Sequence, residues 1–346
     1  MTTIKEIALK TNFSSTTISR VLNNDQSLSV AADTREKIMQ AANELGYKTL
    51  QERKKQQHIP AQDASEKVGV LLCHSVEEEM NDPYFLSIRQ GIEEECRKRD
   101  FIITELFRLT NLRNGQIDKE IKNLVVLGRI GSETLHQISD QLENVVYINH
   151  TVEEEQYDSV IFDFEKATKK ALDHLLDLGY EKIGFIGGEE TEHFRNEQKE
   201  FEDERRVTFK TYMEEKGVFD SSSCYVGEFT MASAYNLMKK AIQKGDLPEA
   251  FFIASDSMAI GALRALQESN YKVPEDVAIV GFNDVQLAQF ASTPLTTVRV
   301  HTEEMGRMGV KLMEDRINGR QIPVKVTLPT ELVVRDSCGA KVASVQ

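Results

Sequence analysis

The segment Ile4–Leu22, IKEIALKTNFSSTTISRVL, has the pattern of two short helices joined by a turn. Thr3 and Glu6 form the S/T-x-x-E capping box that begins a helix, and Ser14 is an N-cap candidate for the second helix. The apolar face of each helix is marked by Ile4, Ile7 and Ala8, and then by Ile18, Val21 and Leu22. Two short helices with a turn of three or four residues between them are typical of a helix-turn-helix.

The second helix carries short polar side chains of the kind that lie against a DNA duplex. Arginine pairs with guanine edges or with phosphates, and hydroxyl groups donate hydrogen bonds to either. The candidate DNA contacts in this part of the chain are Thr3, Ser14, Ser15, Thr16, Thr17, Ser19, Arg20 and Asn23. From this window alone, an ordinary amphipathic helix pair inside a larger core explains the pattern equally well.

A third helix is predicted over TREKIMQAANELGY, which begins at Thr34 and ends with the helix stop Gly46. Its apolar face consists of Ile38, Ala41, Ala42 and Leu45. The segments TIKEIA, TTISRVLNN and TREKIMQAANELGY, taken in this order, resemble the DNA-binding head of the lactose-repressor (LacI) family. The resemblance implies an all-α helix-turn-helix domain over residues 1–48.

The composition suits a protein that contacts nucleic acid at one end only. The chain has 346 residues, 40% of them hydrophobic, and a net charge of −14, which argues against a protein that coats nucleic acid along its whole surface. Residues 1–58 nevertheless contain nine Lys and Arg against six Asp and Glu. A mildly basic head on an acidic body would contact phosphates through the head, although so small an excess is also explained by chance.

The cysteines predict a cytoplasmic protein without a metal or other cofactor. Cys73, Cys96, Cys224 and Cys338 form no CxxC motif and have no histidine spacing suited to zinc, so we expect reduced thiols. No apolar run approaches the roughly 20 residues of a membrane span. The helix-turn-helix at the N-terminus leaves no room for a signal peptide.

Residues 49–66, TLQERKKQQHIPAQDASE, have the polar composition of a linker. In the LacI family the corresponding segment becomes a short hinge helix on the operator, where a leucine wedges open a minor-groove step. Gln56 stands where that leucine is expected, and Leu50 is the only leucine nearby. Arg53, Lys54 and Lys55 are candidate DNA contacts that supply charge without a wedge. A plain solvated tether is the alternative.

From Lys67 onward, buried strands alternate with helices, which predicts parallel sheets covered on both faces. The strand candidates are residues 68–73, 101–107, 124–128, 145–149, 159–164, 182–188, 224–229, 250–255 and 277–282. Nine strands in a chain of this length fit two sheets better than a single sheet. We therefore expect an α/β core of two doubly wound lobes, with a cleft at the carboxyl ends of the strands.

The core also resembles the LacI family, on NDPYFLSIRQGIE, DHLLDLGYEKIGFIGG, IASDSMAIGALRAL, VAIVGFND and PLTTVRV. Within the family, the likeness points to the evolved β-galactosidase (Ebg) repressor group. The resemblance implies a periplasmic-binding-protein-like core over residues 67–340, in which the chain crosses between the lobes near Phe164, between Thr297 and His301, and near Lys325. Lobe 1 would comprise about 67–163 and 299–325, and lobe 2 about 164–298 and 326–340.

No motif for catalysis is present, and we expect no enzyme activity. IGFIGG at residues 183–188 is not GxGxxG, and Glu189 and Glu190 follow it, where a phosphate would be repelled. There is no G-x-S-x-G, HExxH or P-loop, and the seven histidines have no ligand spacing. Asp163 with Glu165 and Asp256 with Asp284 are better explained as helix caps and salt bridges, and Asp256 is expected to cap the helix that follows it.

A sugar site needs planar polar groups for paired hydroxyls and an aromatic face for the apolar side of the ring. The candidate effector contacts, most of them at or after strand ends, are Asp82, Tyr84, Asn149, Arg205, Phe229, Ser255 and Asn283. The resemblance implies this role for five of them, from Asn149 to Asn283. Arg205 is the strongest candidate, because its guanidinium can hold two hydroxyls. A surface salt bridge to Glu202, Asp203 or Glu204 is its alternative role.

The resemblance implies a homodimeric repressor of genes for galactoside or related sugar use. The helix NDPYFLSIRQGIEEECRK would join the first lobes of two subunits, with Phe85, Ile88 and Ile92 as core or interface residues. The sequence near the C-terminus has no leucine heptad that could join two dimers, so we expect a dimer and not a tetramer. A sugar that closes the lobes would move the heads on a pseudo-palindromic operator. The alternative is a cytosolic sugar-binding or sensory protein without operator function.

Overall fold

The computed structural model describes residues 4–22, 30–45, 47, 66–112, 117, 120–194 and 197–340. The chain divides into two units, Met1–Ser65 and Glu66–Gln346, which are called the head and the core below. The expected helix stop Gly46 and the hinge residues Leu50 and Gln56 lie outside the described residues.

The head contains three helices, α1 (Ile4–Thr11), α2 (Ser15–Leu22) and α3 (Ala32–Glu44), which confirms the predicted helix-turn-helix and its closing helix. Ile7, Ile18 and Ile38, one from each helix, have no exposed surface and form the centre of a small apolar core. The backbone N–H of Thr17 donates to Ser14 Oγ at 3.1 Å, so Ser14 caps α2 as predicted. A core of this size fixes the two helices of the motif against α3.

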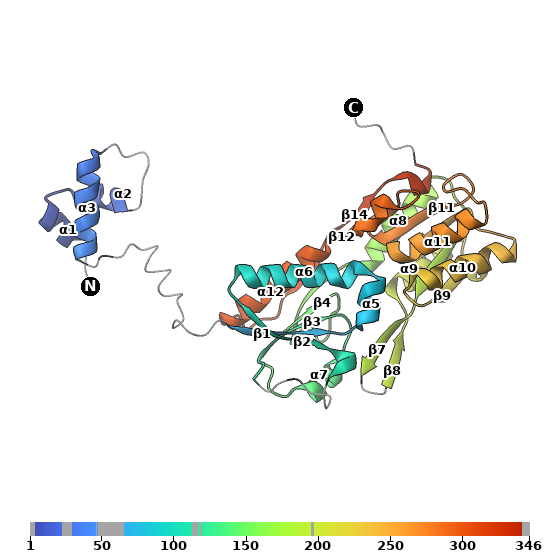
Figure 1. The fold of residues 1–346 in the computed structure, drawn as a ribbon, viewed down its shortest axis with the longest axis horizontal. Helices are drawn as coiled ribbons and strands as arrows, with labels where there is room; N and C mark the ends of the chain where they lie inside the picture. The colour runs from blue at the N-terminus through green and yellow to red at the C-terminus, as the bar shows by residue number, and fades with distance from the viewer. Residues whose placement is uncertain are drawn as a thin grey trace. The chain divides into compact units, whose positions relative to one another are not determined.

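The first sheet of the core has six parallel strands in the order β13-β5-β4-β3-β1-β2. The strands are β1 (Lys67–Leu72), β2 (Ile102–Arg108), β3 (Asn123–Leu127), β4 (Asn144–Ile148), β5 (Asp158–Phe162) and β13 (Lys325–Leu328). Helices α6 (Pro83–Lys98) and α12 (Thr302–Ile317) pack on one face, and α7 (Ser132–Ile138) packs on the other (Figure 1). The short helix α5 (Val76–Asn81) precedes α6, and η1 (Leu109–Asn111) follows β2. This half of the core is lobe 1.

The second sheet has six strands in the order β14-β12-β11-β10-β6-β9, and only its edge strand β14 is antiparallel to its neighbour. The strands are β6 (Ile183–Gly188), β9 (Cys224–Gly227), β10 (Ala250–Ile253), β11 (Ala278–Asn283), β12 (Thr296–Val300) and β14 (Thr330–Val333). The helices are α8 (Phe164–Asp177), α9 (Glu204–Glu215), α10 (Met231–Lys244) and α11 (Asp256–Glu268), with short η3 (Ser221–Ser223), η4 (Gln286–Phe290) and η5 (Asp336–Cys338). Residues of α8 and α9 join one apolar cluster, and those of α10 and α11 join another. This half is lobe 2.

The chain passes between the sheets after Phe162, after Val300 and after Leu328, so each lobe is discontinuous. The crossing after Val300 lies within the expected range from Thr297 to His301, and the crossings after Phe162 and Leu328 lie close to the expected positions near Phe164 and Lys325. Val300 still belongs to the second sheet, where it pairs with Thr330, and Leu328 still belongs to the first, where it pairs with Phe162. Backbone pairing extends both strands to the point where the chain changes lobe.

A two-stranded hairpin of β7 (Glu190–Phe194) and β8 (Glu197–Phe201) leaves lobe 2 directly after β6. It was not predicted, because its sequence, ETEHFRNEQKEF, has few apolar residues and so no alternation of apolar and polar residues to indicate a strand. Strands β12, β13 and β14 were also absent from the predicted set. The last two consist only of exposed and half-buried residues, so they do not form a continuous buried apolar run.

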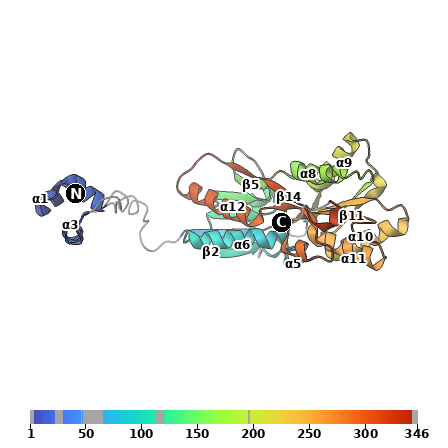
Figure 2. The same ribbon diagram turned by 90° about the horizontal axis from the view of Figure 1, so that it is seen from above.

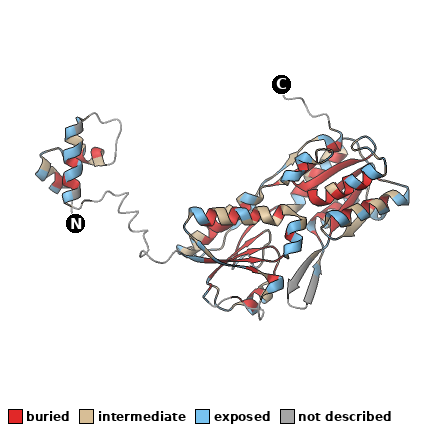
Figure 3. Ribbon diagram, viewed as in Figure 1, coloured by how far each residue is buried: buried red, intermediate tan, exposed pale blue. Residues whose placement is uncertain are grey.

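Most strands of the two sheets are buried on both faces, as expected for sheets with helices on either side (Figure 3). In lobe 1, α6 and α12 run side by side in both views (Figures 1 and 2). Their close approach needs glycine, since a Cβ on Gly91 would lie 2.1 Å from the carbonyl oxygen of Glu303. Ile88 and Ile92, which were expected to be core or interface residues, are fully buried and belong to this core.

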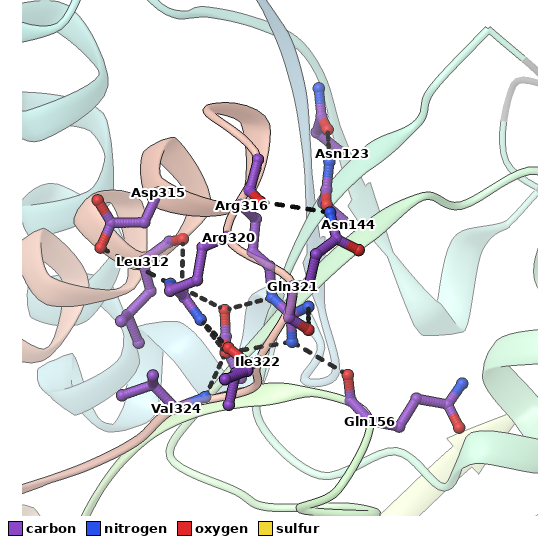
Figure 4. A network of polar contacts seen from close by, with 12 residues as sticks. Asn123, Asn144, Gln156, Leu312, Asp315, Arg316, Arg320, Gln321, Ile322 and Val324 are labelled. Atoms are coloured by element: carbon purple, nitrogen blue, oxygen red, sulfur yellow. Dashed lines mark hydrogen bonds and ion pairs between the residues drawn. The ribbon is translucent and has the colours of Figure 1, made fainter.

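A buried carboxylate ties the end of α12 to the first sheet. Asp158, the first residue of β5, accepts hydrogen bonds from Arg316 Nε at 2.9 Å, from Arg320 Nη2 at 2.7 Å and from the backbone N–H of Val324 at 2.6 Å (Figure 4). Burial raises the pKa of Asp158, but the hydrogen bonds from Arg320 and Arg316 outweigh it and hold the pKa below its ordinary value. The turn between α12 and β13 therefore depends on a charged carboxylate.

Candidate functional site

The helix-turn-helix presents part of the predicted DNA-contact set on its surface. Ser15 and Thr16 are exposed, whereas Thr17, Ser19 and Arg20 are half-buried. The hydroxyl groups of Ser14 and Thr17 lie 2.8 Å apart and share a hydrogen bond at the start of α2. Thr3, Asn23, Arg53, Lys54 and Lys55 lie outside the described residues.

Arg205, in the first turn of α9, occupies the centre of the second candidate site. Its side chain is only 9% exposed and pairs with Asp203, the residue that caps α9 and is 1% exposed. Arg205 Nε donates to Asp203 Oδ1 at 2.9 Å, and Nη2 donates to Oδ2 at 2.5 Å. Arg205 Nη1 donates to the carbonyl oxygen of Ala254 at 2.7 Å, just after β10. Arg205 does pair with Asp203, one of the three partners considered for a surface salt bridge, but the pair is buried and does not lie on the surface.

Three phenylalanine rings face the same guanidinium. The Arg205 Cζ atom lies 5.0 Å from the ring centroid of Phe229, 5.4 Å from that of Phe282 and 5.6 Å from that of Phe164. Such contacts are attractive because the face of an aromatic ring is negative. Phe229 was predicted. Phe164 and Phe282 were missed, although both stand at the end of an apolar strand segment, which is the signal that could have found them.

The lobe 1 side of the site is formed by residues around the start of α6. Asp82 caps α6, accepting from the backbone N–H of Tyr84 at 3.1 Å. The Tyr84 hydroxyl donates to Asn149 Oδ1 at 2.6 Å, just after β4. Burial raises the pKa of Asp82 above its ordinary value, although hydrogen bonds from Tyr84 and from the Ser255 hydroxyl oppose the rise. The contact with Ser255 joins lobe 1 to lobe 2 within this site.

Two asparagines at strand ends have left-handed backbone conformations, with φ of 67° at Asn149 and 106° at Asn283. Asparagine tolerates positive φ better than most residues, and such conformations turn the chain sharply at the end of a parallel strand. Asn283 is buried and directly follows Phe282, whose ring faces Arg205. The contacts around Arg205 therefore connect Asp82, Tyr84, Asn149, Phe229 and Ser255, with Asn283 next to them in the chain.

The residue that caps α11 is Ser255, and the expectation that Asp256 would do so is wrong. Ser255 Oγ accepts from the backbone N–H of Met258 at 3.2 Å. Asp256 is fully buried, and its Oδ2 accepts from the backbone N–H of Val285 at 2.9 Å, which fastens the chain after β11. Burial raises the pKa of Asp256 to about 8.

A buried guanidinium held by one carboxylate and faced by aromatic rings can bind a neutral polyhydroxylated ring. The rings can cover its apolar face, while amide, hydroxyl and carboxyl groups bind its hydroxyls. Among the described residues, no three His, Cys, Asp or Glu side chains are grouped so that they could hold a metal ion. Within the same residues, no helix is long and apolar enough to cross a membrane.

Residues 3–49 match the family described as bacterial regulatory proteins of the lacI family, and residues 172–338 match a periplasmic binding protein-like domain. The chain is 50% identical, over 100% of both chains, to the HTH-type transcriptional repressor MelR of Bacillus subtilis (strain 168). It is 35% identical to the HTH-type transcriptional regulator GalR of Streptococcus thermophilus, over 97% of this chain and 99% of that protein. The expected likeness to the Ebg repressor group is therefore corrected to a similarity to MelR.

Among solved structures, the chain is similar to a transcriptional regulator CelR–cellobiose complex, with 27% identity and a TM-score of 0.67 over 97% of this chain and 100% of that one. The fold is also that of a lac repressor dimer bound to operator and an anti-inducer, with 21% identity, a TM-score of 0.64 and coverage of 98% and 99%. Both the head and the core are included in these matches. The chain therefore belongs to the LacI family of bacterial transcriptional regulators and is not an enzyme.

Proposed function

We propose that this protein represses genes for the use of galactosides or related sugars, and that a small sugar bound between its lobes controls its binding to operator DNA. The observation that carries this proposal is the buried Arg205 site, which takes groups from both lobes of a core attached to a helix-turn-helix head. The similarity to MelR and GalR regulators supports the sugar-gene assignment. Such a regulator works in the cytoplasm, where the chromosome is.

Control of DNA binding follows from a difference in sugar affinity between two arrangements of the lobes. Asp82, Tyr84 and Asn149 belong to lobe 1, whereas Arg205, Phe229, Ser255 and Asn283 belong to lobe 2. A sugar that contacts both groups binds the closed arrangement more tightly and shifts the population toward it. The effector residues would thus read the sugar and set the lobe arrangement at the same time.

The charges around Arg205 favour a neutral sugar over a sugar phosphate. Asp203 already neutralises the guanidinium, and Glu190 and Glu204 lie near enough to interact with it. A phosphate group would meet these carboxylates, and the two described arginines nearest to them, Arg205 and Arg129, are already paired with Asp203 and Glu190. Calorimetry should therefore detect binding of D-galactose or a simple galactoside, and at least tenfold weaker binding of galactose 6-phosphate.

The experiment that tests the function is a gel shift with the purified protein and DNA upstream of sugar-utilisation genes. We expect a sequence-specific shift that changes when D-galactose or lactose is added. A protein that binds sugar but shifts no DNA fragment would be the cytosolic sugar-binding or sensory protein considered as the alternative.

The DNA contacts are proposed from the head. Ser15 and Thr16 are exposed on α2 and can reach base edges, with Arg20 on the same helix. The remaining proposed contacts are Thr3, Ser14, Thr17, Ser19, Asn23, Arg53, Lys54 and Lys55. Two heads acting together would recognise two half-sites of a pseudo-palindromic operator.

A homodimer through the core is proposed from exposed apolar surface. Since Ile88 and Ile92 are buried within lobe 1, the apolar surface lies on α5 and β2, where Met80 is 80% exposed and Ile102 is 50% exposed. Lobe 2 has a groove of about 380 Å³ whose rim includes Phe290, which is 72% exposed. Exposed patches of this kind mark protein interfaces. Sedimentation equilibrium should give a dimer, and M80E with F290E should give a monomer.

A further inference from the structure

An arginine of lobe 1 contacts the unpredicted hairpin β7–β8 of lobe 2. Arg129 stands shortly after β3, following Gly128, whose φ of +106° turns the chain. Arg129 Nε lies 3.2 Å from Glu190 Oε2 at the base of the hairpin. Arg129 Cζ lies 4.7 Å from the ring centroid of Phe201 at the end of β8, and Nη2 lies 3.8 Å from Glu204 Oε1. All three partners belong to lobe 2.

The hairpin also adjoins lobe 1 through its backbone, since β7 lies beside η1. In Figure 1 the hairpin extends out of lobe 2 and runs alongside lobe 1. Arg129 and Glu190 are about one-quarter exposed, so water screens their pairing only in part. The group formed by Arg129, Glu190, Phe201 and Glu204 is called the clasp below.

The clasp is connected electrostatically to the effector site. Burial lowers the pKa of Arg205, but the charges of Asp203 and then of Glu190 raise it above its ordinary value. Burial and Asp203 raise the pKa of Glu190, and Arg205 and Arg129 both oppose the rise. The Glu190 carboxylate therefore interacts with an arginine from each lobe, one of which is the central residue of the effector site.

We propose that Arg129 acts as a latch on the β7–β8 hairpin, holding the lobes together beside the effector site and lowering the cost of closure when a sugar binds. The effector role of Arg205 in this statement rests on the proposed function, whereas the latch itself does not. Arg129 touches no sugar and is a positioning residue. A partly exposed ion pair and a cation–π contact together are worth up to roughly a tenfold change in the closed population.

The latch is tested by the distance between the lobes in the effector-free, full-length protein. Spin labels at E143C in lobe 1 and D246C in lobe 2, in a C224S background, report this distance by double electron–electron resonance. R129A and E190Q should each broaden the distribution toward longer distances, and the double variant should add little to either. R89A is the matched control, because Arg89 is equally exposed but pairs with Glu79 and Glu93 inside lobe 1.

Titration with D-galactose gives the second readout, in which R129A should weaken binding about tenfold while R89A does not. Unchanged distance distributions in R129A, or strictly additive effects of R129A and E190Q, would overturn the latch. Failure of the wild-type protein to bind galactose would count against the proposed effector class, while the distances would still decide the role of Arg129.

Discussion

Arg205 and Asp203 form a buried pair at the first turn of α9, in which Arg205 Nε donates to Oδ1 at 2.9 Å and to Oδ2 at 3.1 Å, and Nη2 donates to Oδ2 at 2.5 Å. The pairing fixes the plane of the guanidinium, which leaves Nη1 to bind the carbonyl of Ala254 and the faces of the group to contact phenylalanine rings. Asp203 is thus a positioning residue for the proposed effector site.

Replacing Arg205 by alanine should abolish the sugar response while operator binding persists, because the two functions belong to different units. The change also leaves Asp203 buried without its partner and should lower the free energy of unfolding by about 3 kcal/mol. Gel shifts with and without D-galactose measure the response, and calorimetry measures the affinity. K182A, which removes an exposed surface pair with Asp246, should behave as the wild type. Unchanged sugar affinity in R205A would exclude Arg205 as an effector anchor.

Replacing Arg20 by alanine should weaken operator binding by roughly 1–3 kcal/mol and relax the sequence preference at one base pair. Arg20 lies in the last turn of α2, the helix whose exposed hydroxyls are proposed to face DNA. Binding to a set of operators with single base changes measures both effects. K37A on α3 is the control within the head. Equal weakening on every DNA would show that Arg20 contacts only phosphate.

The hinge should contact DNA by charge alone. Replacing Arg53, Lys54 and Lys55 together by alanine should reduce the salt dependence of operator binding by about two to three units of slope per subunit. Gln56 is a poor wedge between base pairs, because its amide would lose hydrogen bonds there. Q56L should therefore increase the DNA bend seen in a circular-permutation gel shift. A sharp central kink already present with the wild type would point to Leu50 as a wedge instead.

Asp158 should make the core sensitive to acid. Its pKa in the folded protein lies below the ordinary value of about 3.9, so its contribution to stability is complete above that pH and is lost as the pH falls through the folded pKa. D158N should lower the free energy of unfolding at pH 7 by about 3 kcal/mol, since Arg316 and Arg320 lose a buried partner.

Urea unfolding at a series of pH values checks this expectation. The difference between wild type and D158N should shrink as the pH is lowered below about 4. A difference that stays constant from pH 7 to pH 3 would mean that hydrogen-bond geometry, and not charge, is what Asp158 contributes.

The sequence alone was enough to determine the three helices of the head and the α/β class of the core. The helical spacing of apolar residues within each helix of the head shows which face is buried, and this face contains Ile7, Ile18 and Ile38 in turn. Apolar runs such as Leu124–Leu127 indicate strands that are covered on both faces. These are local consequences of burial. They can be read within one segment without knowing its neighbours.

The tertiary structure alone decided how the candidate site is assembled. Phe229 and Phe282 reach Arg205 from the second sheet, at or just after the ends of β9 and β11. Phe164 comes from the start of α8 and Asp203 from the N-cap of α9, and no local pattern records that meeting. The burial of the Arg205–Asp203 pair and the contact of Arg129 with the hairpin also depend on packing between segments. Charged side chains have the same local pattern whether they are solvated or enclosed, so only the folded chain distinguishes a surface salt bridge from a binding site.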